Sequence, residues 1–485
     1  MRHFTKQEKF MLNYNLVTAS IKKYLIGTGL IILVPMSLTG ETTLAATSGN
    51  SLDDIQAAIN LPEVSIIPQN NTFTATLRPV NGEKSVFEVD TLIPIANPFT
   101  YYDPQQQQLY IPTLKIDNKT YKNVKMVLIT PIQDPPRFRL VATEIDKTAL
   151  KEVVATVETK PVSVDGDAAD DSAIWVHPQD PALSTIIATQ KMGGLSVYDL
   201  SGNEIQYLPE GHMNNVDLRY HFPLNNEQIS LVAVTDRSND SIALYKVNPQ
   251  SRLLEPIAAR IIFSQLKDTI YGVCMYHSQL SNQYYVFIND KSGGVEQWEV
   301  FDNGNKQVDA KVVRTFKVES QVEGCVVDDI LGYFYLSEEA VGIWKFNAEP
   351  NAGDKGHLID TVANGLLTPD IEGLTIYYAN KTEGYLLASN QGSSNFIVYD
   401  RAGNNPFLGR FRIVANSALR IDKVEDTDGI DVVNLSLNSA FPHGLFVTQD
   451  GDNTDPEENQ NFKLVPWEQI ADALDLKKDS FYIPQ

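Results

Sequence analysis

Short runs of alternating apolar and polar residues, separated by turn-forming residues, fill most of the chain. Residues 109–116 alternate, a turn follows at 117–119, and the pattern resumes over 121–129. Two such runs joined by a tight turn are typical of a β-hairpin. The pattern predicts a small all-β module within residues 47–150, in which we find no chemistry. The charged stretch 144–160 is expected to be helical or a linker.

From about residue 161 a longer unit repeats: small residues, an alternating strand that carries one aromatic residue, and a turn. The aromatic residues recur every 46 to 55 residues, which is typical of β-propeller blades. We interpret them as blade packing; they are Tyr198, Tyr245, Trp298, Trp344 and Tyr399. A sixth unit is expected over 444–467, so the sequence predicts a propeller over residues 161–485.

An apolar run precedes each copy of the unit, and we interpret these runs as the innermost strands of the blades. A polar residue follows each run directly; these residues are Lys191, Arg237, Lys291, Glu338 with Glu339, and Gln391. If the runs lie in register around a central axis, the five positions meet at one mouth of the channel and build one site.

Acidic clusters lie beside the same repeats. The first is residues 165–175, DGDAADDSAIW, where four carboxylates precede an apolar segment. The others contain Glu323, Glu338, Glu339, Asp370, Glu372, Asp426, Asp428 and Asp431. Singly, such stretches are more often turns, but a ring of carboxylates is a suitable cage for Ca²⁺. Zn²⁺ fits less well because no paired His or Cys accompanies the acids.

Basic side chains face these acids. Lys191, Arg237 and Lys291 all occupy the position after an apolar run. A site with both bound cations and basic side chains suits a multiply anionic substrate, for which phosphate is the obvious group. The formal net charge of -22, from 39 Lys and Arg against 61 Asp and Glu, argues against nucleic acid or anionic lipid as a partner.

The first 46 residues have the order of a secretory signal: a basic region, the apolar run 24–36, and small residues at 43–46. The alternative is an uncleaved membrane anchor, but the run is shorter than the roughly 20 residues that a spanning helix needs. We therefore expect export to a secreted or periplasmic location, with no stable membrane insertion after cleavage.

The chain contains two cysteines, Cys274 and Cys325, which we expect to be buried structural thiols, although export would permit a bond between them. Neither is followed by Arg at the spacing of a cysteine-dependent phosphatase, where Leu280 and Leu331 stand instead, and no Arg-His-Gly signature occurs. The sequence thus excludes the two common covalent phosphatase chemistries.

Nine ordered segments resemble the β-propeller (alkaline) phytases over most of residues 161–476. They are DGDAADDSAIW, NNVDLRYHFPL, YGVCMYHS, SQVEGCVVDD, SEEAVGIWKFNAEP, LTPDIEGLTIYYA, GYLLASNQG, DTDGIDV and NQNFKLVPWEQIAD. The resemblance implies a six-bladed all-β propeller and a phosphoric monoester hydrolase of the 3-phytase type. Its substrate would be calcium phytate, attacked by water with the help of several Ca²⁺ ions and without a covalent phosphoenzyme, at neutral to alkaline pH.

The resemblance also implies roles for residues. Those matching its calcium ligands are Asp171, Glu323, Glu339, Asp370, Glu372, Gln391 and Asp428, with Asp422 matching by spacing only. We add Asp170 from the first acidic cluster. The phosphate-contacting positions fall on Lys191, Arg237, Tyr271 and Lys291, although Tyr271 is equally well a packed core residue. Our catalytic candidates are Lys191, Arg237, Lys291 and Glu339.

Two departures from the family bear on affinity. The family commonly has a second Lys where Met192 stands and a Glu where Ser292 stands, so a phosphate contact and one metal are expected to be weaker. The rival functions are a non-enzymatic calcium-dependent binding propeller and a calcium propeller lactonase or phosphotriesterase, but neither explains the basic trio. We expect a monomer acting on a small-molecule substrate.

Overall fold

The computed structural model describes residues 31–33, 59–67, 71–79, 86–95, 101–103, 108–116, 119–128, 137–145 and 147–478. The chain divides into two compact units, Met1–Ala149 and Leu150–Gln485, each of which is described by itself.

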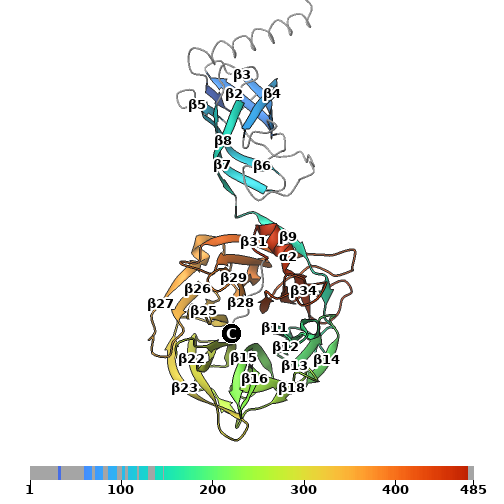
Figure 1. Cartoon of the computed structure of the whole chain (residues 1–485), viewed down its shortest axis with the longest axis vertical. Helices are drawn as coiled ribbons and strands as arrows, with labels where there is room; N and C mark the ends of the chain where they lie inside the picture. The colour runs from blue at the N-terminus through green and yellow to red at the C-terminus, as the bar shows by residue number, and fades with distance from the viewer. Residues whose placement is uncertain are drawn as a thin grey trace, which may run out of the picture. The chain divides into compact units, whose positions relative to one another are not determined.

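The first unit is an antiparallel sheet that closes on itself, in the order β1-β2-β3-β4-β8-β7-β6-β5 (Figure 1). Its strands are β1 (Ile31–Leu33), β2 (Ile59–Ile67), β3 (Asn71–Pro79), β4 (Val86–Ile95), β5 (Tyr101–Asp103), β6 (Gln108–Ile116), β7 (Lys119–Leu128) and β8 (Arg137–Ile145). The predicted hairpin is β6 and β7, whose register pairs Ile116 with Lys119. Leu77, Phe87 and Met126 are buried in this unit.

Most of the expected signal peptide lies outside the described residues. Only residues 31–33 of that segment are described, and they form β1, which pairs with β2 and β5. Within the described part of the chain, no helix has the combination of length and apolar character that crossing a bilayer requires.

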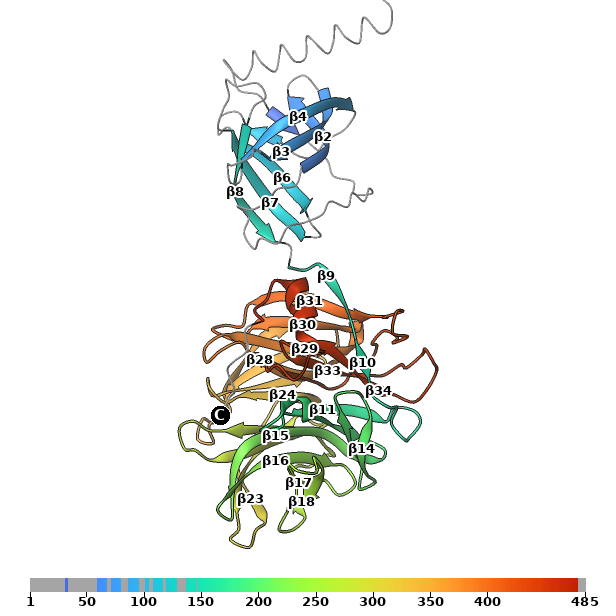
Figure 2. The ribbon, with the colours of Figure 1, turned by 45° about the vertical axis from the view of Figure 1, so that its right-hand side comes forward.

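The second unit is a six-bladed propeller, as predicted (Figures 1 and 2). Blade one is β11 (Ala169–Trp175), β12 (Thr185–Gln190), β13 (Gly194–Asp199) and β14 (Glu204–Leu208). Blade two is β15 (Met213–Leu224), β16 (Glu227–Asp236), β17 (Ser241–Val247), β18 (Leu254–Pro256) and β19 (Ile262–Phe263). Blade three is β20 (Ile270–His277), β21 (Tyr284–Asp290), β22 (Gly294–Asp302) and β23 (Val308–Lys317).

Blade four is β24 (Val322–Asp328), β25 (Tyr333–Glu338), β26 (Gly342–Asn347) and β27 (Gly356–Thr361). Blade five is β28 (Ile371–Tyr378), β29 (Gly384–Asn390), β30 (Asn395–Asp400), β31 (Phe407–Val414) and β9 (Leu150–Val154). Blade six is β32 (Ile430–Val433), β33 (Leu445–Asp450), β34 (Asn461–Pro466) and β10 (Val157–Glu158). The helix α2 (Trp467–Leu474) follows β34.

The described residues of the stretch 144–160 contain no helix, so the helical one of our two expected forms is wrong. The stretch contains β9, which adds in parallel to β31, and β10, which pairs with β34. Blades five and six are therefore completed by strands from the start of the second unit. That unit begins at Leu150 rather than at residue 161.

The assignment of the innermost strands was also wrong. The apolar runs such as 185–190 are the second strands of the blades, and the first strands, which begin with the polar motifs, line the channel. The apolar runs misled the interpretation because second strands such as β12, β21 and β29 are buried along their whole length between neighbouring blades. The aromatic residues of the third strands are buried between blades, as predicted, at Tyr198, Tyr245, Trp298 and Tyr399.

The two cysteines form a disulfide rather than two free thiols. Cys274 lies on β20 and Cys325 on β24, with their Cα atoms 5.8 Å apart. The bond joins the innermost strands of blades three and four. The sequence spacing of the cysteines carried no information on this contact, because it depends on how neighbouring blades are placed.

Candidate active site

An inner ring of side chains lies at one mouth of the channel. In blades one to five it is formed by the second residue of the first strand; these residues are Asp170, Asn214, Tyr271, Glu323 and Glu372. Each of the five strands has a shift of register within its first four residues, where it pairs with the second strand. Such bulges turn a side chain out of the sheet and are common next to active sites.

Glycines allow the blades to approach one another closely behind this ring. A side chain at Gly324 would meet the carbonyl oxygen of Glu372 at 2.1 Å, and one at Gly272 would meet that of Glu323 at 1.9 Å. Neighbouring bulges therefore pack backbone against backbone, which brings the side chains of the inner ring together.

An outer ring is formed by the residue that directly follows each second strand. Its members in blades one to five are Lys191, Arg237, Lys291, Glu339 and Gln391. Because first and second strands are antiparallel, the end of one lies beside the start of the other, as Ala169 pairs with Gln190. The five equivalent positions therefore meet at one mouth, although through second strands rather than the innermost strands we had assumed.

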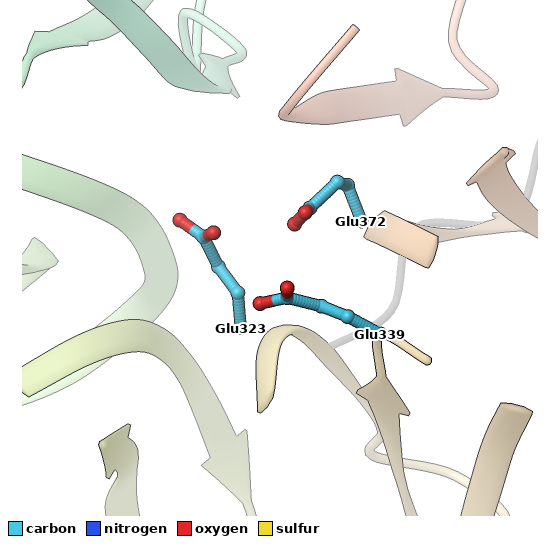
Figure 3. A group of neighbouring side chains, drawn as sticks. All are labelled: Glu323, Glu339 and Glu372. Atoms are coloured by element: carbon cyan, nitrogen blue, oxygen red, sulfur yellow. The ribbon is translucent and has the colours of Figure 1, made fainter. Parts of the chain in front are cut away.

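Three carboxylates converge in this site. Glu323, Glu339 and Glu372 are buried, and each offers an oxygen within 4.8 Å of those of the other two (Figure 3). Burial raises the pKa of Glu323 to about 7 and raises the pKa values of Glu339 and Glu372, and repulsion from Asp428 adds to the effect on all three. Such a group is costly to keep ionised without a cation among its members.

Several carboxylate oxygens of the site have no hydrogen-bond partner despite being buried. They are both oxygens of Asp170, Oε1 of Glu339 and Oε2 of Glu372. Burial also raises the pKa of Asp170 well above its usual value. The neighbouring Glu338 differs, because Ser320 and Trp344 donate to its two oxygens. Glu339 alone of that pair therefore belongs to the site.

Lys191 of the outer ring lies among carboxylates at the mouth of the channel. Its Nζ is 2.7 Å from Asp428 Oδ2 and 2.7 Å from Asp167 Oδ1. Burial alone would lower its pKa, but Asp170 and Asp428 outweigh burial and raise it. Gln391 donates to the other oxygen of Asp428, so this carboxylate joins two members of the outer ring.

Arg237 and Lys291 share the ring of Tyr271. Lys291 Nζ lies 4.3 Å from the ring centroid and the Arg237 guanidinium carbon lies 5.5 Å from it, so both cations contact its π face. Arg237 Nη1 also donates to Asn214 Oδ1 at 2.9 Å. Tyr271 is half-buried, and this contact places it within the site rather than in a blade core.

The remaining predicted ligands differ in their surroundings. Asp171 is buried and accepts from Asn215 and from the backbone of Val216. Asp370 is exposed but close enough to raise the pKa of Glu339, after the larger effect of burial.

Asp422 lies in a different cluster. Lys463 Nζ approaches it at 2.5 Å, and the same ammonium group contacts Glu158 and Asp450. The structure gives Asp422 no contact with the two rings among the described residues. Asp422 therefore lies apart from the mouth, beside a buried lysine, and its match by spacing to a calcium-ligand position stays a prediction.

The two departures from the family pattern lie beside the site. Met192 follows Lys191 and is exposed, and the hydroxyl of Ser292 donates to Asp290 at 2.9 Å. Neither side chain brings a charge to the mouth, so the outer ring has one cation fewer than it would with a lysine at 192.

Sequence reasoning missed the interior of the channel. A cavity of about 440 Å³ extends along the first strands and is lined by Asp217, Arg219, Asp329 and Asp431, among others. Arg219 bonds to Asp217 and Asp329, and the backbone of Ile174 donates to Asp431. The motif NNVDLRYHFPL contains two of these residues, but alternation alone does not show that a first strand faces the channel.

Comparisons with known proteins agree with this architecture. The model of the phytase family matches residues 125–481. A 3-phytase of Bacillus subtilis (strain 168) is 45% identical over 329 residues, which cover 67% of this chain and 85% of that protein.

Two solved structures are distantly similar to this chain. A luciferin-regenerating enzyme aligns with a TM-score of 0.41 and 11% identity, over 63% of this chain and 95% of that one. A protein of unknown function from Bacteroides thetaiotaomicron VPI-5482 aligns with a TM-score of 0.40 and 8% identity, over 87% of this chain and all of that one. Neither likeness bears on the chemistry. The match to the family model and the 45% identical relative show that the chain belongs to the β-propeller phytase family.

Proposed function

We propose that the protein hydrolyses phosphomonoesters of phytate, myo-inositol hexakisphosphate, to lower inositol phosphates and inorganic phosphate, with calcium ions at the mouth of the propeller. Membership of the phytase family supports the substrate. The main support for a role of calcium is the convergence of Glu323, Glu339 and Glu372, whose ligand atoms lie within 4.8 Å of one another.

The side chains present fit calcium. Buried carboxylate oxygens without partners require a cation, and a set made only of oxygen donors suits a hard ion such as Ca²⁺ better than Zn²⁺. The proposed ligands are Asp170, Asp171, Glu323, Glu339, Asp370, Glu372, Gln391 and Asp428. Bound calcium would neutralise these acids and polarise phosphoryl oxygens.

The chain's own side chains then bind the phosphate group and assist the attack of water. Lys191, Arg237 and Lys291 donate to phosphate oxygens and stabilise the charge that develops on them as water attacks phosphorus and the bond to the inositol oxygen breaks. Gln321 Nε2 donates to Glu339 Oε2 at 2.9 Å, which orients the carboxylate and leaves Oε1 available to the attacking water. Burial raises the pKa of Glu339 above its ordinary value, which makes the carboxylate a better proton acceptor.

Phosphate release from phytate near pH 8 tests this proposal. We expect release with added calcium and none with a chelator. Lys191→Ala should lower kcat/KM by about 10- to 100-fold, the value of a hydrogen bond to a charged group. A folded wild-type protein that releases no phosphate at any calcium concentration would favour the binding-propeller alternative. Cleavage of a neutral lactone or phosphotriester in preference to phytate would favour the other rival.

The raised pKa values also predict an opposite pH dependence of stability with and without calcium. The pKa of Glu323 is about 7 in the folded chain and about 4.3 in an unfolded one. Between these values the folded chain holds the proton more tightly, so the metal-free protein loses stability as pH rises from about 5 to 8. Calcium needs the deprotonated acids and therefore stabilises more at high pH.

Melting temperatures measured with chelator and with calcium at about pH 6 and 8 check this prediction. The chelated protein should melt lower at pH 8, and the calcium-induced rise should be larger there. Glu323→Gln should flatten both trends. A calcium effect of equal size at both pH values would contradict the assignment of these acids.

We further propose that the protein is exported. The N-terminal charge and apolar pattern supports export, and so does the Cys274–Cys325 disulfide, because such bonds persist in oxidising compartments. The proposal leaves a monomer as the simplest active form, since every candidate residue comes from one chain.

A further inference from the structure

One member of the inner ring has no role among the ligands and cations discussed so far. Asn214 is fully buried and occupies the same position in blade two that Asp170, Glu323 and Glu372 occupy in blades one, four and five. A neutral amide therefore stands in a ring that is otherwise acidic or phenolic.

The amide of Asn214 bridges the two halves of the site. Its Oδ1 accepts from Arg237 Nη1 at 2.9 Å, and its Nδ2 donates to Glu323 Oε1 at 2.6 Å and to Asn215 Oδ1 at 2.6 Å. Because a guanidinium group can only donate, the amide oxygen must face Arg237 and the amide nitrogen must face Glu323. Both donor hydrogens and the acceptor are then engaged, as a buried amide requires.

A direct contact between Arg237 and Glu323 would have a different effect. A guanidinium and a carboxylate that meet form a strong charge-assisted pair, which would occupy the cation needed by phosphate and the anion needed by calcium. With the amide between them, Arg237 is tied by a single hydrogen bond and Glu323 Oε2 is not used by Asn214. The structure records no ion pair of Arg237 with any carboxylate among the residues it describes.

We propose that Asn214 is a positioning residue that holds Arg237 and Glu323 in place and prevents them from neutralising each other. It thereby fixes the distance between the phosphate-binding half and the metal-binding half of the mouth. This inference rests on the proposed function, because it assigns Arg237 to phosphate and Glu323 to calcium.

The test compares Asn214→Leu, which keeps the shape of the side chain but removes both hydrogen bonds, with the wild type. KM for phytate should rise by about tenfold, the value of a lost bond to a charged group, with a smaller change in kcat. Calcium binding measured by calorimetry without substrate should weaken by a similar factor. Asn461→Leu is the matched control, because Asn461 is equally buried but lies on β34, outside both rings.

A second variant separates the two contacts. Asn214→Asp pairs Arg237 with a carboxylate and replaces the donor that faces Glu323, so its KM for phytate should rise at least as much as in Asn214→Leu. Melting temperatures of all variants with chelator identify a loss of fold. An Asn214→Leu protein that melts like the control and keeps KM and calcium affinity within twofold of wild type overturns the proposal. If instead the wild type neither binds calcium nor releases phosphate, it is the proposed function that fails.

Discussion

Glu372→Gln is expected to abolish most of the activity while stabilising the calcium-free protein. The substitution keeps the shape of the side chain but removes one of the three converging charges, so kcat/KM for phytate should fall by about 100-fold or more. The chelated variant should melt at a higher temperature than the chelated wild type, because burial and its neighbours Glu323 and Glu339 raise the pKa of Glu372 and so oppose its charge. Opposite effects on function and stability are typical of a binding site.

Calcium titrations of melting temperature and phosphate release measure both effects on one sample. Glu338→Gln is the matched control, since that buried carboxylate lies one residue from Glu339 but is held by Ser320 and Trp344. Glu338→Gln should melt at a lower temperature than the wild type but keep the calcium-induced rise in melting temperature. An active Glu372→Gln protein with a normal calcium response would show that the three glutamates do not form the metal site.

Arg401→Met should destabilise the propeller by about 3–5 kcal/mol, the usual result of removing one partner of a buried ion pair. Arg401 forms a two-bond pair with Asp328 in which neither side chain is exposed, and it also donates to the carbonyl oxygen of Asn380. The pair joins the residue that follows β30 in blade five to the last residue of β24 in blade four. Without the cation, Asp328 stays buried and uncompensated.

Denaturant unfolding at constant calcium measures this loss. Arg412→Met is the control: its pair with Glu152 is about half exposed on both sides, so it should change the free energy of unfolding by at most about 1 kcal/mol. Adding Asp328→Leu to Arg401→Met should recover much of the stability, since the uncompensated charge is gone. An Arg401→Met protein as stable as the control would mean that water reaches Asp328.

The sequence predicted the propeller because each blade repeats the same local pattern, and short-range alternation determines the strands. It could not rank the strands from the axis outward. The second strands carry an apolar run and few charges, as in Thr185–Gln190, whereas the first strands mix acids with apolar residues because they line a polar channel. Hydrophobicity alone therefore pointed to the wrong strand as the innermost one.

The candidate site was predicted in part for a related reason. Lys191, Arg237, Lys291, Glu339 and Gln391 were found as equivalent positions along the chain, and antiparallel pairing does bring that end of each blade to one mouth. Asn214 was missed because its importance lies in contacts with residues 23 and 109 positions away. Asp422, which matched a ligand position by spacing only, lies apart from these residues, and its partner Lys463 in β34 could not be predicted from the spacing.

The closure of the ring by β10 has a consequence for the time course of folding. Glu158 in β10 meets Lys463 in β34, 305 positions later. At about 5–20 residues per second, the ribosome takes roughly 15 to 60 s to synthesise that interval. During this time β10 has no partner strand, and β9 also waits for β31, so the edges of these two strands are open to pairing with other chains. Completion of the last blade therefore ends the period in which the nascent chain is most exposed to aggregation.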